Sequence, residues 1–273
     1  MKKLLNMSVL VTIDNPKGQK ATETFRTQHS KNGLTEKNAQ ALKKSSGFVN
    51  YLLTGIKRFF MKYFFMRVPE YELARTILGK DFIPPERIMR SCKGIAYTNK
   101  QLAQFKKTVP AREILEWCRD NNFMLIAGPD RPMSFLEINV MRSNYFYSGK
   151  SGFYADRSFS QKDKAETKWY MICKVPAPES VLKSWEEQQD TISDVETVPN
   201  VAEFTWAITT YKKIRGVYLF HKFYVRTSSL DLDGNHISVG NFDKRGMFID
   251  AIRDGLRFGL LGLSVTRNWY LKP

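Results

Sequence analysis

Three charged side chains in the middle of the chain have types and spacing that suit metal-dependent hydrolysis. Asp130 follows the apolar run 123–127, and Glu166 and Lys168 stand at the start of another apolar segment. Two carboxylates can hold Mg²⁺, the ion can activate water, and the lysine can stabilise developing negative charge. A Mg²⁺-dependent nuclease is therefore one hypothesis. Ordinary surface charge is the alternative, because charged residues make up 26% of the chain and are mostly exposed in proteins.

Positive charge is the strongest signal for a binding function. The chain has 43 Lys and Arg residues against 27 Asp and Glu, a net charge of +16. Residues 1–69 hold 13 basic and 3 acidic side chains, so +10 of this charge lies there. An asymmetric basic region is typical of proteins that bind nucleic acid or an anionic membrane surface. The cations that we expect to contact phosphate are Lys43, Lys44, Lys57, Arg58, Lys62 and Arg67.

An amphipathic helix is predicted among these cations, within a helical stretch over about residues 36–65. Apolar side chains recur at three- and four-residue spacing from Val49 to Phe64, with the cations on the other side. The aromatic face can pack on a protein core, which we favour, or lie on an anionic membrane surface. Lys57, Arg58 and Lys62 interrupt any apolar run long enough to span a bilayer, so no transmembrane segment is expected.

Two features predict a cytoplasmic protein. The apolar run at the N-terminus is interrupted by Asn6 and Ser8 and ends at Asp14 without a small-residue cleavage site, so we expect a strand there and not a signal peptide. The cysteines are odd in number and widely spaced, which is unlike a disulfide framework. We expect each to be a small buried hydrophobic residue, and they are Cys92, Cys118 and Cys173.

Other short motifs favour turns over chemistry. Gly149-Lys150-Ser151 resembles the end of a phosphate-binding loop, but Asn144 stands where that pattern needs Gly. The segment 231–235 has the alternating carboxylates of a calcium loop, but its Gly comes too early and Phe242 stands where the twelfth-position Glu would be. We therefore expect a polar turn at the first site and a hairpin turn at the second.

The histidines do not point to catalysis. His29, His221 and His236 have no Cys or His partner at zinc-ligand spacing, and no nucleophile elbow is present. His221 and His236 can face each other across the hairpin described next, in a structural role. The sequence thus favours a non-catalytic protein, with no cofactor implied except Mg²⁺ under the nuclease hypothesis.

An α+β fold must position these side chains, and its clearest element is a hairpin over residues 217–242. Aromatic and β-branched residues crowd both sides of Asp233-Gly234, a dipeptide suited to a tight turn. We predict a helical, basic part over 1–122 and an α+β part over 123–273 with an antiparallel sheet flanked by helices, and we leave open whether they share one core. Further helices are expected near 70–78, 84–89, 110–121, 134–141, 180–192 and 201–214, and strands near 123–127, 168–175, 246–250 and 261–266.

Three segments of the second part carry a family resemblance. Residues 183–189 (KSWEEQQ), 198–203 (VPNVAE) and 224–229 (YVRTSS) resemble a family of uncharacterised bacterial proteins, over about residues 127–266. The resemblance implies a bacterial or mobile-element setting and transfers no functional residue. The leading hypothesis is a non-catalytic nucleic-acid-binding protein, in which aromatic residues such as Phe65 add base stacking. The alternatives are a protein-interaction module and the Mg²⁺-dependent nuclease.

Overall fold

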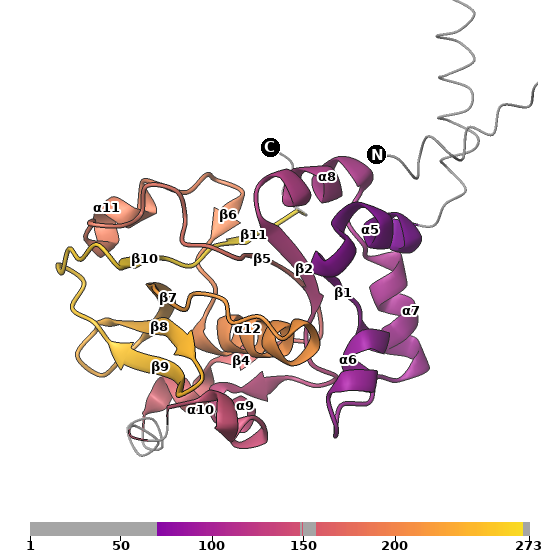
Figure 1. Ribbon diagram of the computed structural model, residues 1–273, viewed down its shortest axis with the longest axis horizontal. Helices are drawn as coiled ribbons and strands as arrows, with labels where there is room; N and C mark the ends of the chain where they lie inside the picture. The colour runs from indigo at the N-terminus through magenta and orange to yellow at the C-terminus, as the bar shows by residue number, and fades with distance from the viewer. Residues whose placement is uncertain (1–69, 148, 150–156, 270–273) are drawn as a thin grey trace, which may run out of the picture. The chain divides into compact units, whose positions relative to one another are not determined.

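The computed structural model describes residues 70–147, 149 and 157–269, which form an α+β fold as predicted (Figure 1). The predicted N-terminal strand and the amphipathic helix lie outside the described residues. The helices run in chain order as α5 Glu70–Leu78, α6 Pro85–Ser91, α7 Asn99–Lys107, α8 Arg112–Asp120, α9 Phe135–Met141, α10 Ser158–Lys162, α11 Trp185–Gln189 and α12 Val201–Arg215, with 3-10 turns η2 Gly79–Asp81 and η3 Ser143–Tyr145.

A five-stranded mixed sheet forms one part of the fold. Its strands are ordered β1 Phe82–Ile83, β2 Phe123–Ala127, β5 Trp169–Cys173, β11 Thr266–Arg267 and β6 Glu196–Thr197. Strand β1 is parallel to β2, and every other neighbouring pair is antiparallel. All residues of β2 and β5 are buried, which confirms the two strands predicted from continuous apolar runs. A separate ribbon pairs β3 Met133–Ser134 with β4 Lys164–Ala165.

The predicted hairpin is the centre of a four-stranded sheet. The strands are ordered β10 Leu261–Leu263, β7 Tyr224–Leu230, β8 His236–Asp243 and β9 Gly246–Ala251, with β7, β8 and β9 antiparallel. The turn between β7 and β8 has Gly234 at φ +81°, a conformation that favours glycine. The Asp231 carboxylate accepts the N–H groups of Asp233 and Asn235 at 3.0 and 2.8 Å. The hairpin-turn interpretation of residues 231–235 is therefore confirmed.

The first strand of the hairpin begins later than predicted. Residues 217–223 form turns and an irregular segment, and the strand starts at Tyr224. Phe220 has φ +55°, and its ring packs on Phe204 of α12 with centroids 5.1 Å apart. The aromatic residues of this segment thus serve the core and not a strand, a distinction that composition does not make.

Helix boundaries follow capping residues. The helices predicted over 134–141 and 201–214 are present as α9 and α12. Each begins at a capping box, formed at Ser134 and at Asn200. Helix α7 was not predicted individually, although Thr98 and Gln101 form the same kind of box. The helix expected over 180–192 is shorter, because Leu182 has φ +60° and the capping box at Ser184 starts α11 at Trp185. The strand expected over 261–266 divides into β10 and β11, which belong to different sheets.

Helix α12 packs against strands of both sheets. Ten of its 15 residues are buried, as expected for a helix that is apolar on most of its circumference. Trp206 ties it to β2, since its indole N–H donates to the carbonyl of Ala127 at 2.9 Å. The helix ends at Gly216, whose φ of +74° suits a left-handed cap.

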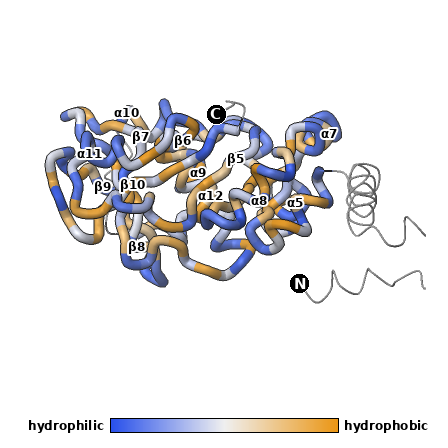
Figure 2. The backbone as a smooth tube through the Cα atoms, turned by 90° about the horizontal axis from the view of Figure 1, so that it is seen from above, coloured by the Kyte–Doolittle hydropathy of each residue, from blue (hydrophilic) through white to orange (hydrophobic). Residues whose placement is uncertain are grey.

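One hydrophobic core extends through the described residues. Ile83, Ile88 and Leu115 from residues 70–122 belong to the same buried cluster as Ile172 and Val239. The core therefore continues across residue 122. Figure 2 shows hydrophilic segments along α7 and α11 at the periphery, and hydrophobic segments passing through the interior. Among the described residues, no helix has the length and apolar character needed to cross a membrane.

Candidate functional site

The six cations predicted to contact phosphate lie outside the described residues, and their role stays a prediction. They are Lys43, Lys44, Lys57, Arg58, Lys62 and Arg67. Most of the segment 149–151, where a polar turn is predicted, also lies outside, since only Gly149 is described.

The nuclease hypothesis depends on residues near the end of β2, where two chain segments meet. Gly128 donates its N–H to the carbonyl of Lys168 at 2.8 Å, so the backbones after Ala127 and before Trp169 are neighbours. The Asp130 carboxylate accepts the N–H of Ala96 at 2.8 Å and lies 3.6 Å from the Arg131 guanidinium. Its side chain is 13% exposed. Asp130 thus anchors the segment before α7.

Lys168 has partners of its own. Its ammonium lies 3.1 Å from the Glu203 carboxylate and 5.0 Å from the centroid of the Tyr170 ring. Glu203 is itself held in the capping box of α12, where it accepts the N–H of Asn200 at 3.1 Å. The backbone N–H of Glu166 donates to the Tyr170 hydroxyl at 2.6 Å. Within the described residues, no group of three or more His, Cys, Asp and Glu side chains is arranged to hold a metal ion.

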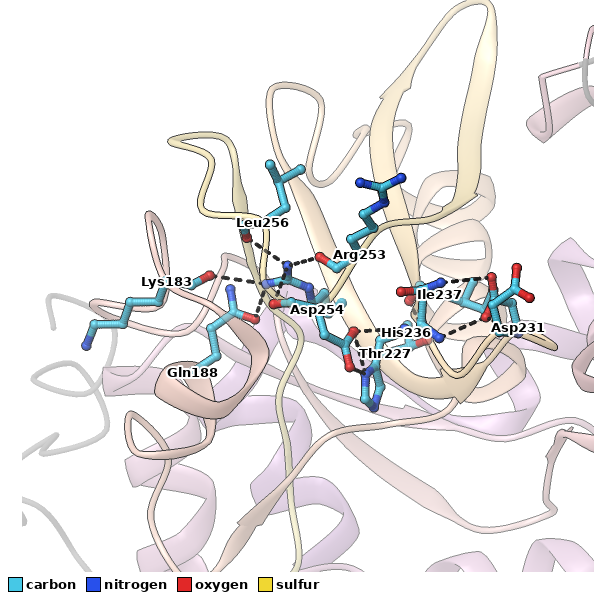
Figure 3. Close-up of polar contacts among 12 residues, drawn as sticks. Lys183, Gln188, Thr227, Asp231, His236, Ile237, Arg253, Asp254 and Leu256 are labelled. Atoms are coloured by element: carbon cyan, nitrogen blue, oxygen red, sulfur yellow. Dashed lines mark hydrogen bonds and ion pairs between the residues drawn. The ribbon is translucent and has the colours of Figure 1, made fainter.

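A dense polar constellation centres on Arg226, a fully buried residue of β7. Figure 3 labels the residues that accept its hydrogen bonds. Its guanidinium donates to the Gln188 side-chain oxygen at 2.9 Å and to the Lys183 carbonyl at 3.2 Å. It also donates to the carbonyls of Arg253, Asp254 and Leu256, at 3.0, 3.2 and 2.9 Å. Burial lowers the pKa of Arg226, and the nearby Asp254 opposes this effect. These contacts join the segment before α11 and the 253–256 turn to the sheet.

His236 and Asp254 form an acid–base pair beside this constellation (Figure 3). The His236 Nδ1 lies 2.9 Å from each Asp254 oxygen, and the Trp185 ring stacks on the imidazole at 3.4 Å. Burial lowers the pKa of His236, while the hydrogen bond and charge of Asp254 raise it in part. A neutral imidazole that donates Nδ1–H to a carboxylate has the form of a general base. Here the ring is covered by Trp185, so the pair fastens the 253–256 turn to β8.

The prediction that His221 and His236 face each other across the hairpin is wrong. Leu230 is the cross-strand partner of His236, and His221 is an exposed residue of the 217–223 segment, which precedes the hairpin strands. The histidine therefore pairs with a residue 18 positions later that no local pattern identifies.

The cysteines are buried and free, as predicted. Cys118 lies 3.4 Å from the Met171 sulfur, and burial raises the pKa of its thiol to about 12. Burial also raises the pKa values of Cys92 and Cys173. A protonated, buried thiol is a poor nucleophile, so these side chains act as core residues.

Two hollows lie near the pair Trp117 and Arg267, in which the guanidinium is 3.9 Å from the centroid of the Trp117 ring; Arg267 lines one and Trp117 the other. One has a volume of about 180 Å³ and is lined by Lys168, Glu203 and Arg267. The other has a volume of about 200 Å³, and its lining mixes apolar residues such as Phe123 with polar ones such as Asn122 and Glu196. Small-molecule sites usually measure roughly 300–1,000 Å³, so each hollow is small for a cofactor.

The chain matches no protein-family model, no curated protein and no solved structure. The predicted resemblance to uncharacterised bacterial proteins therefore stays a prediction. Sequence reasoning also missed Arg226 and the His236–Asp254 pair. Strand periodicity placed Arg226 in β7 but gave no sign of its acceptors, which lie 27 to 43 residues away.

Proposed function

We propose that the protein is a non-catalytic nucleic-acid-binding protein that contacts phosphate mainly through residues 1–69. One observation carries this proposal: the 13 cations of that segment have only 3 acidic residues among them, so at least ten cannot be neutralised within it. Many cations of the described residues, in contrast, lie in ion pairs. Examples are Arg75–Glu72, Arg112–Glu116, Arg119–Asp120, Lys174–Asp81, Arg245–Asp243 and Arg257–Glu187.

Unneutralised cations bind polyanions by releasing condensed counterions. Each phosphate contact on duplex DNA lowers the slope of log K against log salt by about 0.9, and contacts to phosphate carry no direct sequence information. We therefore expect steep salt dependence and weak sequence preference. The six residues proposed to make these contacts are Lys43, Lys44, Lys57, Arg58, Lys62 and Arg67.

The first test replaces these six residues with Gln in the full chain and measures binding to a labelled 20-base-pair DNA by fluorescence anisotropy, across ~50 to 200 mM salt. The salt slope should flatten by about 5. The control removes the same charge from described ion pairs and should keep most of the wild-type slope. It carries Arg75→Gln, Lys106→Gln, Arg112→Gln, Arg119→Gln, Arg245→Gln and Arg257→Gln.

Three outcomes would overturn the proposal. No binding by the wild type at the lowest salt would remove nucleic acid as the ligand and favour a protein partner. An equal loss in both six-residue variants would mean that net charge, and not residues 1–69, determines binding. Shortening of the DNA with Mg²⁺ present, lost in Glu166→Gln, would replace the proposal with the nuclease hypothesis.

A further inference from the structure

Cations lie on α6 and in the last turn of α12, two helices that pack against each other. Arg87 projects from α6, and Lys213 and Arg215 lie in the last turn of α12. Arg87 is close enough to Arg215 for its charge to lower the pKa of the Arg215 guanidinium, second to the effect of burial. Lys213 acts in the same way on the thiol of Cys92, at the end of α6. Arg87 of α6 and Arg215 of α12 therefore lie near each other, and the charge of Asp81 acts on Arg215 in the opposite direction.

The carboxylates of this region are already bound to other groups. Asp81 accepts from the Lys174 ammonium at 2.7 Å and from the Tyr211 hydroxyl at 2.8 Å. Glu86 accepts from the Tyr71 hydroxyl and lies 4.0 Å from the Lys106 ammonium. Among the residues that the structure describes, Arg87, Lys213 and Arg215 have no carboxylate within ion-pair distance. This separates them from the paired arginines elsewhere on the surface.

A fourth cation, Arg142, lies between Cys92 at the end of α6 and the middle of α12. The guanidinium of Arg142 is 6% exposed and donates to the Thr210 hydroxyl at 2.7 Å and to the Cys92 sulfur at 3.7 Å. Its acceptors in the described residues are neutral, so its charge adds to the positive potential of this face. The Nε of Arg215 is also buried without a hydrogen-bond partner, although its Nη2 donates to the Phe82 carbonyl at 3.2 Å.

Helix electrostatics explain only part of this arrangement. Cations are stabilised at a helix C-terminus, and this accounts for basic residues in the last turn of α12. Lys212 is an example, since it donates to the Gly216 carbonyl at 2.7 Å. Arg87 is different, because it lies in the first turn of α6, where the helix dipole disfavours positive charge. Neither the dipole nor an ion pair accounts for its position.

We infer that Arg87, Lys213 and Arg215 form a second phosphate-binding site, which contacts the nucleic-acid backbone from the folded part of the chain. The inference rests on the proposed function and adds a defined surface to it. Three cations at the junction of two helices suit up to three adjacent phosphates of a phosphodiester chain, one contact for each cation. A free polyphosphate has the same chemistry and is distinguished below.

The test uses the full chain with Arg87→Gln and Lys213→Gln combined. Both side chains are exposed, so the fold should tolerate the change, and Arg215 is kept because it bonds to Phe82. In the anisotropy assay the salt slope should flatten by about 2, at about 0.9 for each lost contact. The control is Arg75→Gln with Arg119→Gln, which removes the same charge from exposed ion pairs and should leave the slope near that of the wild type.

A second arm separates this inference from the proposed function. The variant with six substitutions in residues 1–69 should retain a slope of about 3, and the added Arg87→Gln and Lys213→Gln changes should reduce it to about 1, the contact left with Arg215. If the wild type binds DNA and the two double variants behave alike, the second site is wrong and the proposed function stands. If the wild type binds tripolyphosphate through Arg87 and Lys213 but binds no DNA, the backbone assignment is wrong and the proposed function also fails.

Discussion

Arg226 and Arg142 are both buried arginines, but they connect different amounts of the chain. Arg226 lies in β7 and bonds to residues 183, 188, 253, 254 and 256, which belong to two separate segments outside its own sheet. Arg142 follows α9, and three of its bonds go to a single stretch of α12, at Trp206, Thr209 and Thr210. Its guanidinium also lies 4.3 Å from the centroid of the Trp206 ring.

The acceptors explain what each arginine does for stability. Those of Arg226 are mostly carbonyls in irregular segments, which this one side chain fastens to the sheet (Figure 3). The acceptors of Arg142 belong to α12, a regular helix with hydrogen bonds of its own. The Thr209 hydroxyl, for instance, also donates to the Thr205 carbonyl at 2.6 Å. We therefore expect a buried cation to stabilise the fold most where its hydrogen bonds satisfy backbone carbonyls that no helix or strand pairs.

The largest effect should come from Arg226→Met. The substitution removes all five bonds and leaves buried carbonyls without this donor, so we expect the free energy of unfolding to fall by about 3–5 kcal/mol. Urea denaturation followed by circular dichroism measures the change. Arg226→Lys is the matched variant; it keeps the charge but has no planar fork, and it should recover only part of the loss. A loss below ~1 kcal/mol in Arg226→Met would contradict this account.

Arg142→Met should cost less, about 1–2 kcal/mol by the same measurement. The Met side chain fills much of the volume, and the Thr209 hydroxyl keeps its bond within α12. Equal losses in Arg142→Met and Arg226→Met would show that removal of a buried charge, and not the connection of distant segments, determines the effect. That result would remove the distinction drawn between the two arginines.

The contrast also shows what the sequence could predict. The strands β2 and β5, the hairpin and α12 depend on local signals, namely apolar runs, an Asp-Gly turn and the Asn200 capping box. Short strands such as β1 and β6 have two residues each and form by pairing with a neighbouring strand, β2 and β11 respectively. No local sequence pattern predicts this pairing. The start of β7 was misplaced because the aromatic residues of 217–223 pack on α12 outside any strand.

The polar constellations were harder to predict from the sequence, because their residues come together only in the folded chain. The acceptors of Arg226 were hidden for this reason, and so was the approach of Arg87 in α6 to Arg215 in α12. The proposed nuclease residues stay a prediction, and the structure shows only where two of them bond. Asp130 and Lys168 looked chemically related by residue type, yet each side chain has its own partner. Residue types name possible chemistry, and long-range packing decides whether side chains share a site.

The smallest expected effect is on the pH dependence of stability, and it concerns His236, which lies beside the Arg226 contacts. Burial and the nearby Arg226 charge lower the pKa of His236, and Asp254 opposes them. Because the folded pKa lies below the unfolded value of about 6.5, the folded chain binds fewer protons near that pH, and stability falls as the pH drops through this window. His236→Gln should therefore show a shallower loss of stability between about pH 7 and pH 5 than the wild type. His221→Gln, at an exposed position, is the control and should follow the wild type. If His236→Gln follows the wild type as well, the turn that Arg226 and Asp254 hold does not sense the charge on this ring.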